Sequence, residues 1–415
     1  PRSTPTVNAV VSPASDSDEF MHSTSRIDEL APPTHDELAR QQFVSMLRKR
    51  VMVDMAGRMR QVYDGQVAPA FEAAQGRAPA DGREVRKAML PNPYFKAWSA
   101  LRYTAQEMTW WSVIPQVERN LPKLVERVKS IGPTNRIGGT LKLNPDVEIP
   151  REVSELDIHL MPGCYHTEHG EGDVAQGALY TYGTSVFGSG LKLATKRGGV
   201  AASIARWLAI AHPELKPRKL LDLGCTTGNN LFPYLELFPQ CEGYGVDIGA
   251  PLLRYAHARA ETLGHKVHFS QQRAEKLDYP DATFDVVCSS FFLHEISVKS
   301  TRQVLRECHR VLKPGGVMVH MELPPSSETD PYYTFYLDWD AYYNNEPHYA
   351  AFRALDFRQE VLAAGFAADD YFARRIPNYS TIPDRQFEAS CRGEIEAPKH
   401  GNGASWFIFG ARKQG

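Results

Sequence analysis

The sequence lacks a surplus of charge of either sign. Its 415 residues carry 47 Lys and Arg against 49 Asp and Glu, which gives a formal net charge of −2. Proteins that bind nucleic acid need an excess of basic side chains to neutralise phosphates, so this balance argues against a nucleic-acid partner. A hydrophobic content of 42% is that of an ordinary globular protein, and the length favours two or three domains.

Cysteine is also scarce, and long apolar runs are missing. The six cysteines form no C-x-x-C pair and several fall in expected core elements, so we expect packed, reduced thiols in a cytoplasmic protein and no structural zinc. The most apolar stretch, 200–211, is interrupted by Arg206, and the sequence therefore predicts no membrane span. The first residues show no positively charged segment followed by an apolar one, the pattern of a secretory signal.

What the sequence does contain is a strand followed by a glycine turn within residues 219–230. An apolar strand ends at Leu223, and Gly224 and Gly228 follow it. Because glycine has no Cβ, the backbone of such a turn can approach a nucleotide-like ligand, and the first turn of the next helix offers unpaired N–H groups. A dinucleotide site is the alternative, but the turn lacks the G-x-G-x-x-G spacing of that fingerprint.

Further strands and helices follow this turn in regular alternation. Asp247 ends the next strand, where an acid can accept hydrogen bonds from both hydroxyls of a ribose. This alternation predicts an α/β fold with a Rossmann-like, doubly wound parallel sheet, whose ligand crevice lies at the carboxyl ends of the strands. We expect strands at 243–246, 267–270, 284–290 and 317–321, helices at 201–212, 300–312 and 355–364, and a final hairpin of strands near 367–374 and 405–412.

Five segments in this order resemble the class I S-adenosylmethionine-dependent methyltransferases, and most of all the branch of the ubiquinone and menaquinone biosynthesis C-methyltransferases. They read DLGCTTGN, VDIG, AEKLDYPDATFDVV, FFLHEI and LRECHRVLKPGG, and they lie within 216–325. The resemblance implies a seven-stranded methyltransferase sheet and S-adenosylmethionine as the cofactor. It does not identify the methyl acceptor.

The resemblance also implies roles for single residues. Asp222, Gly224 and Gly228 would surround the methionine end of the cofactor, and Asp247 would bind its ribose. The other implied cofactor residues, near the adenine and the sulfonium, are Ile248, Gln272, Ala274, Ser290 and Phe291.

Two positions depart from the family pattern. Thr226 replaces a glycine, which implies a tighter or differently pitched loop. Arg273 replaces an aspartate that would accept a hydrogen bond from the adenine amino group, and arginine is a donor only. Either Gln272 takes over this contact, or adenine selectivity rests on the backbone.

The chain outside these motifs divides by composition. Residues 1–35 are rich in Ser, Thr, Pro and Asp, which predicts a disordered tail, with an arm packed on a partner subunit as the lesser alternative. Apolar residues at helical spacing predict a helical domain over 36–131, with helices to about Glu72 and at 83–90, 94–109 and 112–130. Frequent Gly and Pro predict an irregular connector or lid over 132–200, with short extended runs at 141–144 and 156–161. The methyltransferase domain then covers 201–415, and the helical domain offers a surface for a homodimer.

Aromatic residues are dense in the segment 330–349. This density predicts a roof over the acceptor pocket, with packing against the N-terminal helices as an alternative that is compatible with it. Candidate catalytic residues are His294 and Glu295 after one strand, Glu322 after the next, and Tyr165 in the connector. A purely structural role in the turn is the alternative for His294.

A second group of polar residues, His166, Glu168 and His169, lies in the connector loop. Three ligands from one loop, with no fourth partner evident, make a weak metal site, and we expect no metal in this protein.

Together these features predict an enzyme that transfers a methyl group from S-adenosylmethionine to an apolar or aromatic small molecule, at oxygen or carbon. One alternative is methylation of sulfur or nitrogen in a small polar metabolite, which needs no base. The other is a non-catalytic interaction protein that binds the cofactor and holds a partner on its N-terminal helices.

Overall fold

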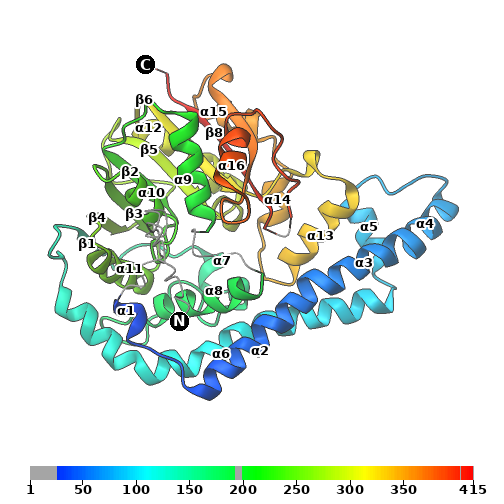
Figure 1. The fold of residues 1–415 in the computed structure, drawn as a ribbon, viewed down its shortest axis with the longest axis horizontal. Helices are drawn as coiled ribbons and strands as arrows, with labels where there is room; N and C mark the ends of the chain where they lie inside the picture. The colour runs from blue at the N-terminus through cyan, green and yellow to red at the C-terminus, as the bar shows by residue number, and fades with distance from the viewer. Residues whose placement is uncertain (1–25, 192–198, 402, 415) are drawn as a thin grey trace, which may run out of the picture.

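The computed structural model describes residues 26–191, 199–401 and 403–414, and an eight-stranded sheet forms the centre of this part of the chain (Figure 1). The strands follow the order β1-β4-β3-β2-β5-β6-β8-β7. Neighbouring strands from β1 to β6 are parallel, whereas β8 runs antiparallel to both β6 and β7. Their bounds are β1 Thr140–Lys142, β2 Lys219–Leu223, β3 Glu242–Asp247, β4 Val267–Gln271, β5 Phe284–Ser290, β6 Leu312–Glu322, β7 Tyr371–Pro377 and β8 Ser405–Arg412.

The sheet is doubly wound, as the alternation of strands and helices predicted. Leu220 and Val286 pack with helices α9 (Val200–Ala211), α10 (Phe232–Leu237) and α11 (Ala250–Leu263) in one apolar core. Leu221 and Val287 pack with α12 (Val298–Val311) and α15 (Phe357–Ala363) in a second core. Because successive strand residues point to opposite faces, these neighbouring pairs show that both faces of the sheet are covered.

Seven of the strands form the arrangement expected from the resemblance, and β1 adds an eighth at one edge of the described sheet. β1 confirms the extended run expected near 141–144, and it pairs with β4. The extended run expected at 156–161 is wrong, because Ile158–Leu160 forms a short 3-10 helix in which His159 and Leu160 have positive φ. The long loop expected at 380–403 contains α16 (Asp384–Cys391), whose Phe387 is buried.

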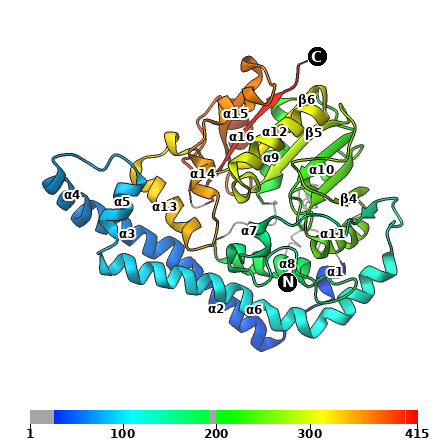
Figure 2. The same cartoon turned by 180° about the vertical axis from the view of Figure 1, so that it is seen from behind.

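Two long helical segments run side by side beneath the sheet (Figures 1 and 2). The first begins with α2 (His35–Lys49), capped by a reciprocal pair of hydrogen bonds between Thr34 and Glu37, and stays helical to Gln75 through α3 (Ala56–Val62) and α4 (Ala68–Gln75). The second is α6 (Pro93–Ile131), which begins after the Asn92 cap with proline in its first position. The sequence predicted two helices here, but the chain continues through 110–111 without a break.

Helix α8 (Ala175–Leu191) occupies the end of the segment that the sequence predicted to be irregular. Two of its glycines, Gly177 and Gly183, lie at close helix contacts, although glycine there suggested irregularity. A Cβ on Gly177 would lie 2.5 Å from Cβ of Tyr255, and one on Gly183 would overlap the Trp110 ring. Glycine therefore serves here for close packing against α11 and α6, and not for a turn.

Helix α13 (Pro331–Tyr342), in the aromatic segment, joins the N-terminal helices to the sheet domain. It packs on α5 (Gly82–Met89), and its Trp339 stacks on Trp98 of α6 with ring centroids 3.5 Å apart. Trp339 Nε1 also donates to Ser99 Oγ over 2.9 Å. The alternative of packing against the N-terminal helices therefore holds for this segment.

The described part of the expected tail is anchored to the sheet domain. Helix α1 (Arg26–Glu29) holds Asp28, whose carboxylate accepts a hydrogen bond from Tyr255 and pairs with Arg259 of α11. Residues 1–25, for which the sequence predicted disorder, lie outside the described residues, as do 192–198 of the connector. All six cysteines are free and buried. No helix in the described ranges has the length and apolar character needed to cross a membrane.

We expect Trp339→Ala to lower the free energy of unfolding by about 3–5 kcal/mol, because it removes a fully buried ring from the contact between α13 and α6. Urea unfolding followed by circular dichroism measures this change. Trp111→Ala is the matched control, since the Trp111 side chain is 60% exposed, and its effect should stay within about 0.5 kcal/mol. Equal stability of the two variants would contradict this role of Trp339.

The buried His320 of β6 should make stability depend on pH. Burial lowers its pKa to about 3, so the folded protein binds fewer protons than the unfolded chain between about pH 3 and pH 6.5. Stability therefore rises with pH across this window, and lowering the pH from 7.5 to 5 should cost about 2 kcal/mol through this residue. Urea midpoints of wild type and His320→Gln test this, and an equally steep acid slope in the variant would contradict it.

Candidate functional site

A cavity of about 900 Å³ opens at the carboxyl ends of the parallel strands. Its floor is formed by the turns after β2, β3 and β5, and its walls by α6, α8 and α13. Of the residues singled out in the sequence, it brings together Tyr165, Gly224, Thr226, Asp247, Ile248, Gln272, Ala274, Ser290, Phe291, His294 and Glu295. Asp222, Gly228 and Glu322 lie behind this lining, and His166, Glu168 and His169 lie away from it.

The turn after β2 is shaped for close approach of a ligand. Gly224 has a φ of +65°, and a Cβ there would lie 2.5 Å from the Phe292 ring. Thr226 takes a left-handed conformation with a φ of +46° at the position where the family has glycine. Its backbone N–H donates to Asp247 Oδ2 over 2.9 Å, which ties this turn directly to the acid at the end of β3.

Asp247 and Asp222 have different environments. Each oxygen of Asp247 accepts one backbone N–H, from Gly249 and from Thr226. Asp222 Oδ1 accepts from Asn230 Nδ2, whereas its Oδ2 is buried without a hydrogen-bond partner among the described residues. Burial raises the pKa of Asp222 to about 7.

In the segment that follows β4, Arg273 forms ion pairs with Glu275 at 2.8 Å and with Glu148 at 3.1 Å. Gln272 faces the cavity, but its amide oxygen accepts from the N–H of Asp278 over 2.7 Å. Glu275 also lines the cavity. It offers a carboxylate two residues after the expected aspartate, and the sequence analysis did not single it out.

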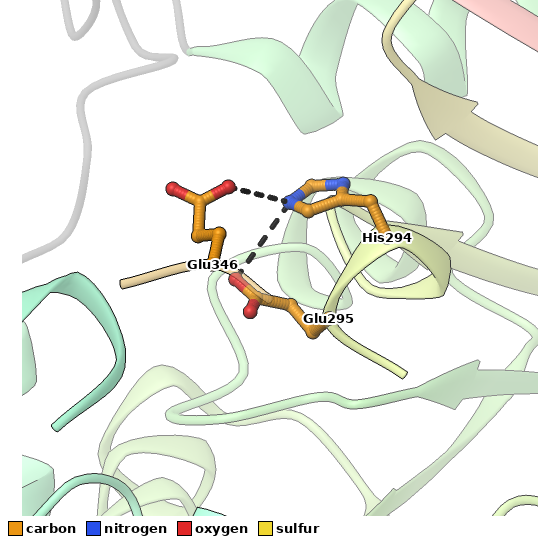
Figure 3. A group of neighbouring side chains, drawn as sticks. All are labelled: His294, Glu295 and Glu346. Atoms are coloured by element: carbon orange, nitrogen blue, oxygen red, sulfur yellow. Dashed lines mark ion pairs between the residues drawn. The ribbon is translucent and has the colours of Figure 1, made fainter. Parts of the chain in front are cut away.

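The opposite end of the cavity holds a cluster of histidines and glutamates. His294 Nδ1 donates to Glu322 Oε2 over 2.5 Å, and this turns its Nε2 toward Glu295 and Glu346, at 3.6 and 3.8 Å (Figure 3). His159 Nε2 lies 2.8 Å from Glu295 Oε1, and its Nδ1 lies 3.3 Å from Glu346 Oε1. His159, the pair His294 and Glu295, and Glu346 therefore converge from three separate segments of the chain.

The charges in this cluster decide which groups keep their protons. Burial by itself lowers the pKa of His294, but the Glu322 carboxylate outweighs it and raises that pKa to about 9. For His159, Glu295 and Glu346 outweigh burial in the same way and raise its pKa to about 10. Burial raises the pKa of Tyr165 well above its usual value. In the structure as it stands, all three side chains hold their protons at neutral pH.

The sequence analysis missed His159 and Glu346. His159 belongs to the connector, and its carbonyl accepts hydrogen bonds from Trp110 Nε1 and Gln106 Nε2 of α6, which hold it over the cavity. Glu346 follows α13 in the aromatic segment. The aromatic density did mark this segment as part of the pocket, but no local spacing marked either residue.

Comparison with known proteins finds methyltransferases. Residues 220–316 match the family described as a methyltransferase domain. The chain is 31% identical over 163 residues to a demethylmenaquinone methyltransferase of Thermus thermophilus, covering 39% of this chain and 68% of that protein. It is 36% identical over 135 residues to the Deinococcus radiodurans demethylmenaquinone methyltransferase (32% of this chain, 53% of that protein). It is 30% identical over 146 residues to an ajmaline N-methyltransferase of Rauvolfia serpentina (32% and 50%).

Similar solved structures include an O-methyltransferase family protein of Burkholderia thailandensis, with 17% identity, a TM-score of 0.38, and coverage of 58% of this chain and 63% of that one. Another is a Haemonchus contortus phosphoethanolamine N-methyltransferase in complex with S-adenosylhomocysteine (16%, TM-score 0.37, 52% and 53%).

Proposed function

This chain belongs to the class I S-adenosylmethionine-dependent methyltransferases, and we propose that it methylates an apolar or aromatic small molecule at oxygen or carbon. The observation that carries the proposal is the single continuous cavity. One end is lined by the glycine turn and Asp247, and the other by apolar side chains around the histidine and glutamate cluster. A cofactor and an acceptor would thus meet inside one continuous space.

The residues at the first end fit S-adenosylmethionine. Gly224 lines the cavity with backbone alone, and Asp222, which lies behind the lining, holds Asn230, a residue of the lining, through its Oδ1. Asp247 uses one lone pair of each oxygen for a backbone N–H, so each oxygen can still accept from a ribose hydroxyl. We propose that these residues hold the cofactor, together with Ile248, Ala274, Ser290 and Phe291 along the same wall.

S-adenosylmethionine supplies an activated methyl group, so the chain needs to provide placement, exclusion of water and a path for any proton that leaves the acceptor. Placement falls to the apolar walls. The acceptor end is lined by Trp110, Ile158, Leu337, Tyr349 and Trp406. Such surfaces bind flat or hydrocarbon-rich molecules and exclude water from the site of reaction.

The proton that leaves the acceptor would pass to the Glu295 carboxylate of the cluster at this end, because His294 and His159 already hold their protons. Glu322 orients His294 without reaching the cavity, which makes Glu322 a positioning residue. Glu295 faces the cavity, and its Oε2 is buried with no hydrogen-bond partner among the described residues. Tyr165 keeps its proton and therefore serves as a donor that can orient an acceptor oxygen.

Methylation of an amine is a second candidate, because Glu295 and Glu346 would pair with an ammonium group at the same place. An ajmaline N-methyltransferase is also among the relatives. A non-catalytic cofactor-binding protein would show cofactor affinity but no turnover with either class of acceptor.

We expect Asp247→Asn to weaken binding of S-adenosylhomocysteine at least ~10-fold, because charged hydrogen bonds to the ribose are lost. Isothermal titration calorimetry measures the affinity. Asp285→Asn is the matched control, since Asp285 also accepts two backbone N–H groups, from Arg218 and Lys219, but lies outside the cavity lining. The assignment fails if both variants bind like wild type, or if both lose affinity equally.

Methyl transfer from labelled S-adenosylmethionine should be detectable with hydroxylated aromatic acceptors. Leu337→Ala should then lower kcat/KM about 10-fold, because an apolar contact is removed from the acceptor wall. Tyr342→Ala on the same helix is the control, since Tyr342 is 58% exposed. Turnover of small polar amines alone, unaffected by Leu337→Ala, would favour the second candidate.

A further inference from the structure

The cluster at the acceptor end has the donor set of a metal site, built from three separate segments of the chain. His159 comes from the connector, His294 and Glu295 from the turn after β5, and Glu346 from the loop after α13. We propose that His294, Glu295 and Glu346 bind one divalent first-row metal ion of the Zn²⁺ or Mn²⁺ type, with His159, which lies against Glu295, as the fourth ligand after a side-chain adjustment.

The distances between the donor atoms support this. His294 Nε2 and one carboxylate oxygen each of Glu295 and Glu346 lie within 4.8 Å of one another, and all three side chains point toward a common centre (Figure 3). A metal with bonds of about 2.1 Å holds neighbouring ligand atoms roughly 3–3.5 Å apart. The nitrogen–oxygen distances in the cluster lie on either side of this range. They are 2.8 Å for His159–Glu295, 3.6 Å for His294–Glu295 and 3.8 Å for His294–Glu346. Small side-chain adjustments would therefore complete the site.

The surroundings of His294 are those of a metal-ligating histidine. Its Nδ1 donates to Glu322, which leaves Nε2 to face Glu295 and Glu346. Glu322 is in turn fixed, since its Oε1 accepts from the N–H groups of Phe292 and Leu293. A carboxylate behind a histidine sets the tautomer and increases the basicity of the ligating nitrogen.

An independent observation is the free oxygen of Glu295. The residue is only 9% exposed, it faces the cavity, and its Oε2 has no hydrogen-bond partner among the described residues. A buried carboxylate oxygen without a partner is costly, and a cation bound by both oxygens of Glu295 would compensate it, with Oε1 as the oxygen that faces His294. The connector loop offers no comparable site, since Glu168 is engaged by Arg254.

The donor types narrow the choice of ion. Two imidazoles and two carboxylates without a thiolate suit ions such as Zn²⁺ and Mn²⁺ better than the soft ions that prefer sulfur. With Glu322 counted, three carboxylates surround the two imidazoles, and a bound cation would take the place of the protons that the imidazoles hold in its absence. Arg102, which also lines the cavity, is already paired with Asp340.

An ion at this position would bind an oxygen of the acceptor and lower the pKa of its hydroxyl group. This role rests on the proposed function, whereas metal binding itself does not. The two are therefore separable by experiment.

The test uses the full chain, stripped with a chelator and dialysed against Zn²⁺ or Mn²⁺, without cofactor or acceptor. We expect one ion per chain by elemental analysis and a Mn²⁺ spectrum altered by the protein in electron paramagnetic resonance. Glu346→Gln and His294→Asn should each weaken binding at least ~10-fold, because each removes one of four ligands. The double variant His166→Asn/His169→Asn, outside the cluster, should bind like wild type.

Thermal unfolding separates loss of metal binding from misfolding, because only a folded variant shows an unfolding transition. Excess Zn²⁺ should raise the Tm of wild type by roughly 2–4 °C and leave the Tm of Glu346→Gln unchanged. Absence of a stoichiometric ion, equal binding by Glu346→Gln, or loss of binding in the His166/His169 variant alone would overturn the proposal. Methyl transfer that persists in excess chelator would reject the catalytic role of the ion and leave the proposed function intact.

Discussion

The buried carboxylate of Glu322 determines the geometry of the acceptor end. It lies at the carboxyl end of β6, is fully buried, and accepts from the backbone of Phe292 and Leu293 and from His294. A buried charge without such partners would be strongly destabilising, so the turn after β5 has to fold around it. That requirement fixes the position of His294. Phe291, at the start of the same turn, has a positive φ and lies on the cavity wall.

The N-terminal helices complete the site and do not merely cover it. Helix α6 contributes Gln106 and Trp110, which hold the carbonyl of His159, and Arg102, which pairs with Asp340 of α13. The stacked rings of Trp98 and Trp339 fix α13 against the same helix. The position of His159 over the cavity therefore depends on packing between segments that are far apart in the chain. Loosening α6 would disturb the acceptor end before the cofactor end.

The cofactor end could be predicted from the sequence because it is local. Gly224 and Asp247 each follow a strand, and parallel neighbouring strands bring their carboxyl ends to one edge wherever the rest of the chain lies. His159 and Glu346 could not be predicted, since their approach depends on the packing of α6, α8 and α13. The same dependence explains the misjudged connector: Gly177 and Gly183 suggested turns, but their partners Tyr255 and Trp110 come from other helices.

Thr226 shows how a departure from the family pattern can be accommodated by a neighbouring residue. A non-glycine residue with a positive φ costs on the order of 1 kcal/mol or more, and the surroundings have to enforce it. Here the enforcing contact is its N–H bond to Asp247, the acid that we propose binds the ribose. The same carboxylate, that of Asp247, thus stabilises the strained turn and is proposed to bind the ligand. A ligand that drew Asp247 away from Thr226 would release this contact, so the acid has to serve both partners at once. Its two oxygens offer four lone pairs in all, so the carboxylate can accept from the backbone and from a ribose hydroxyl at the same time.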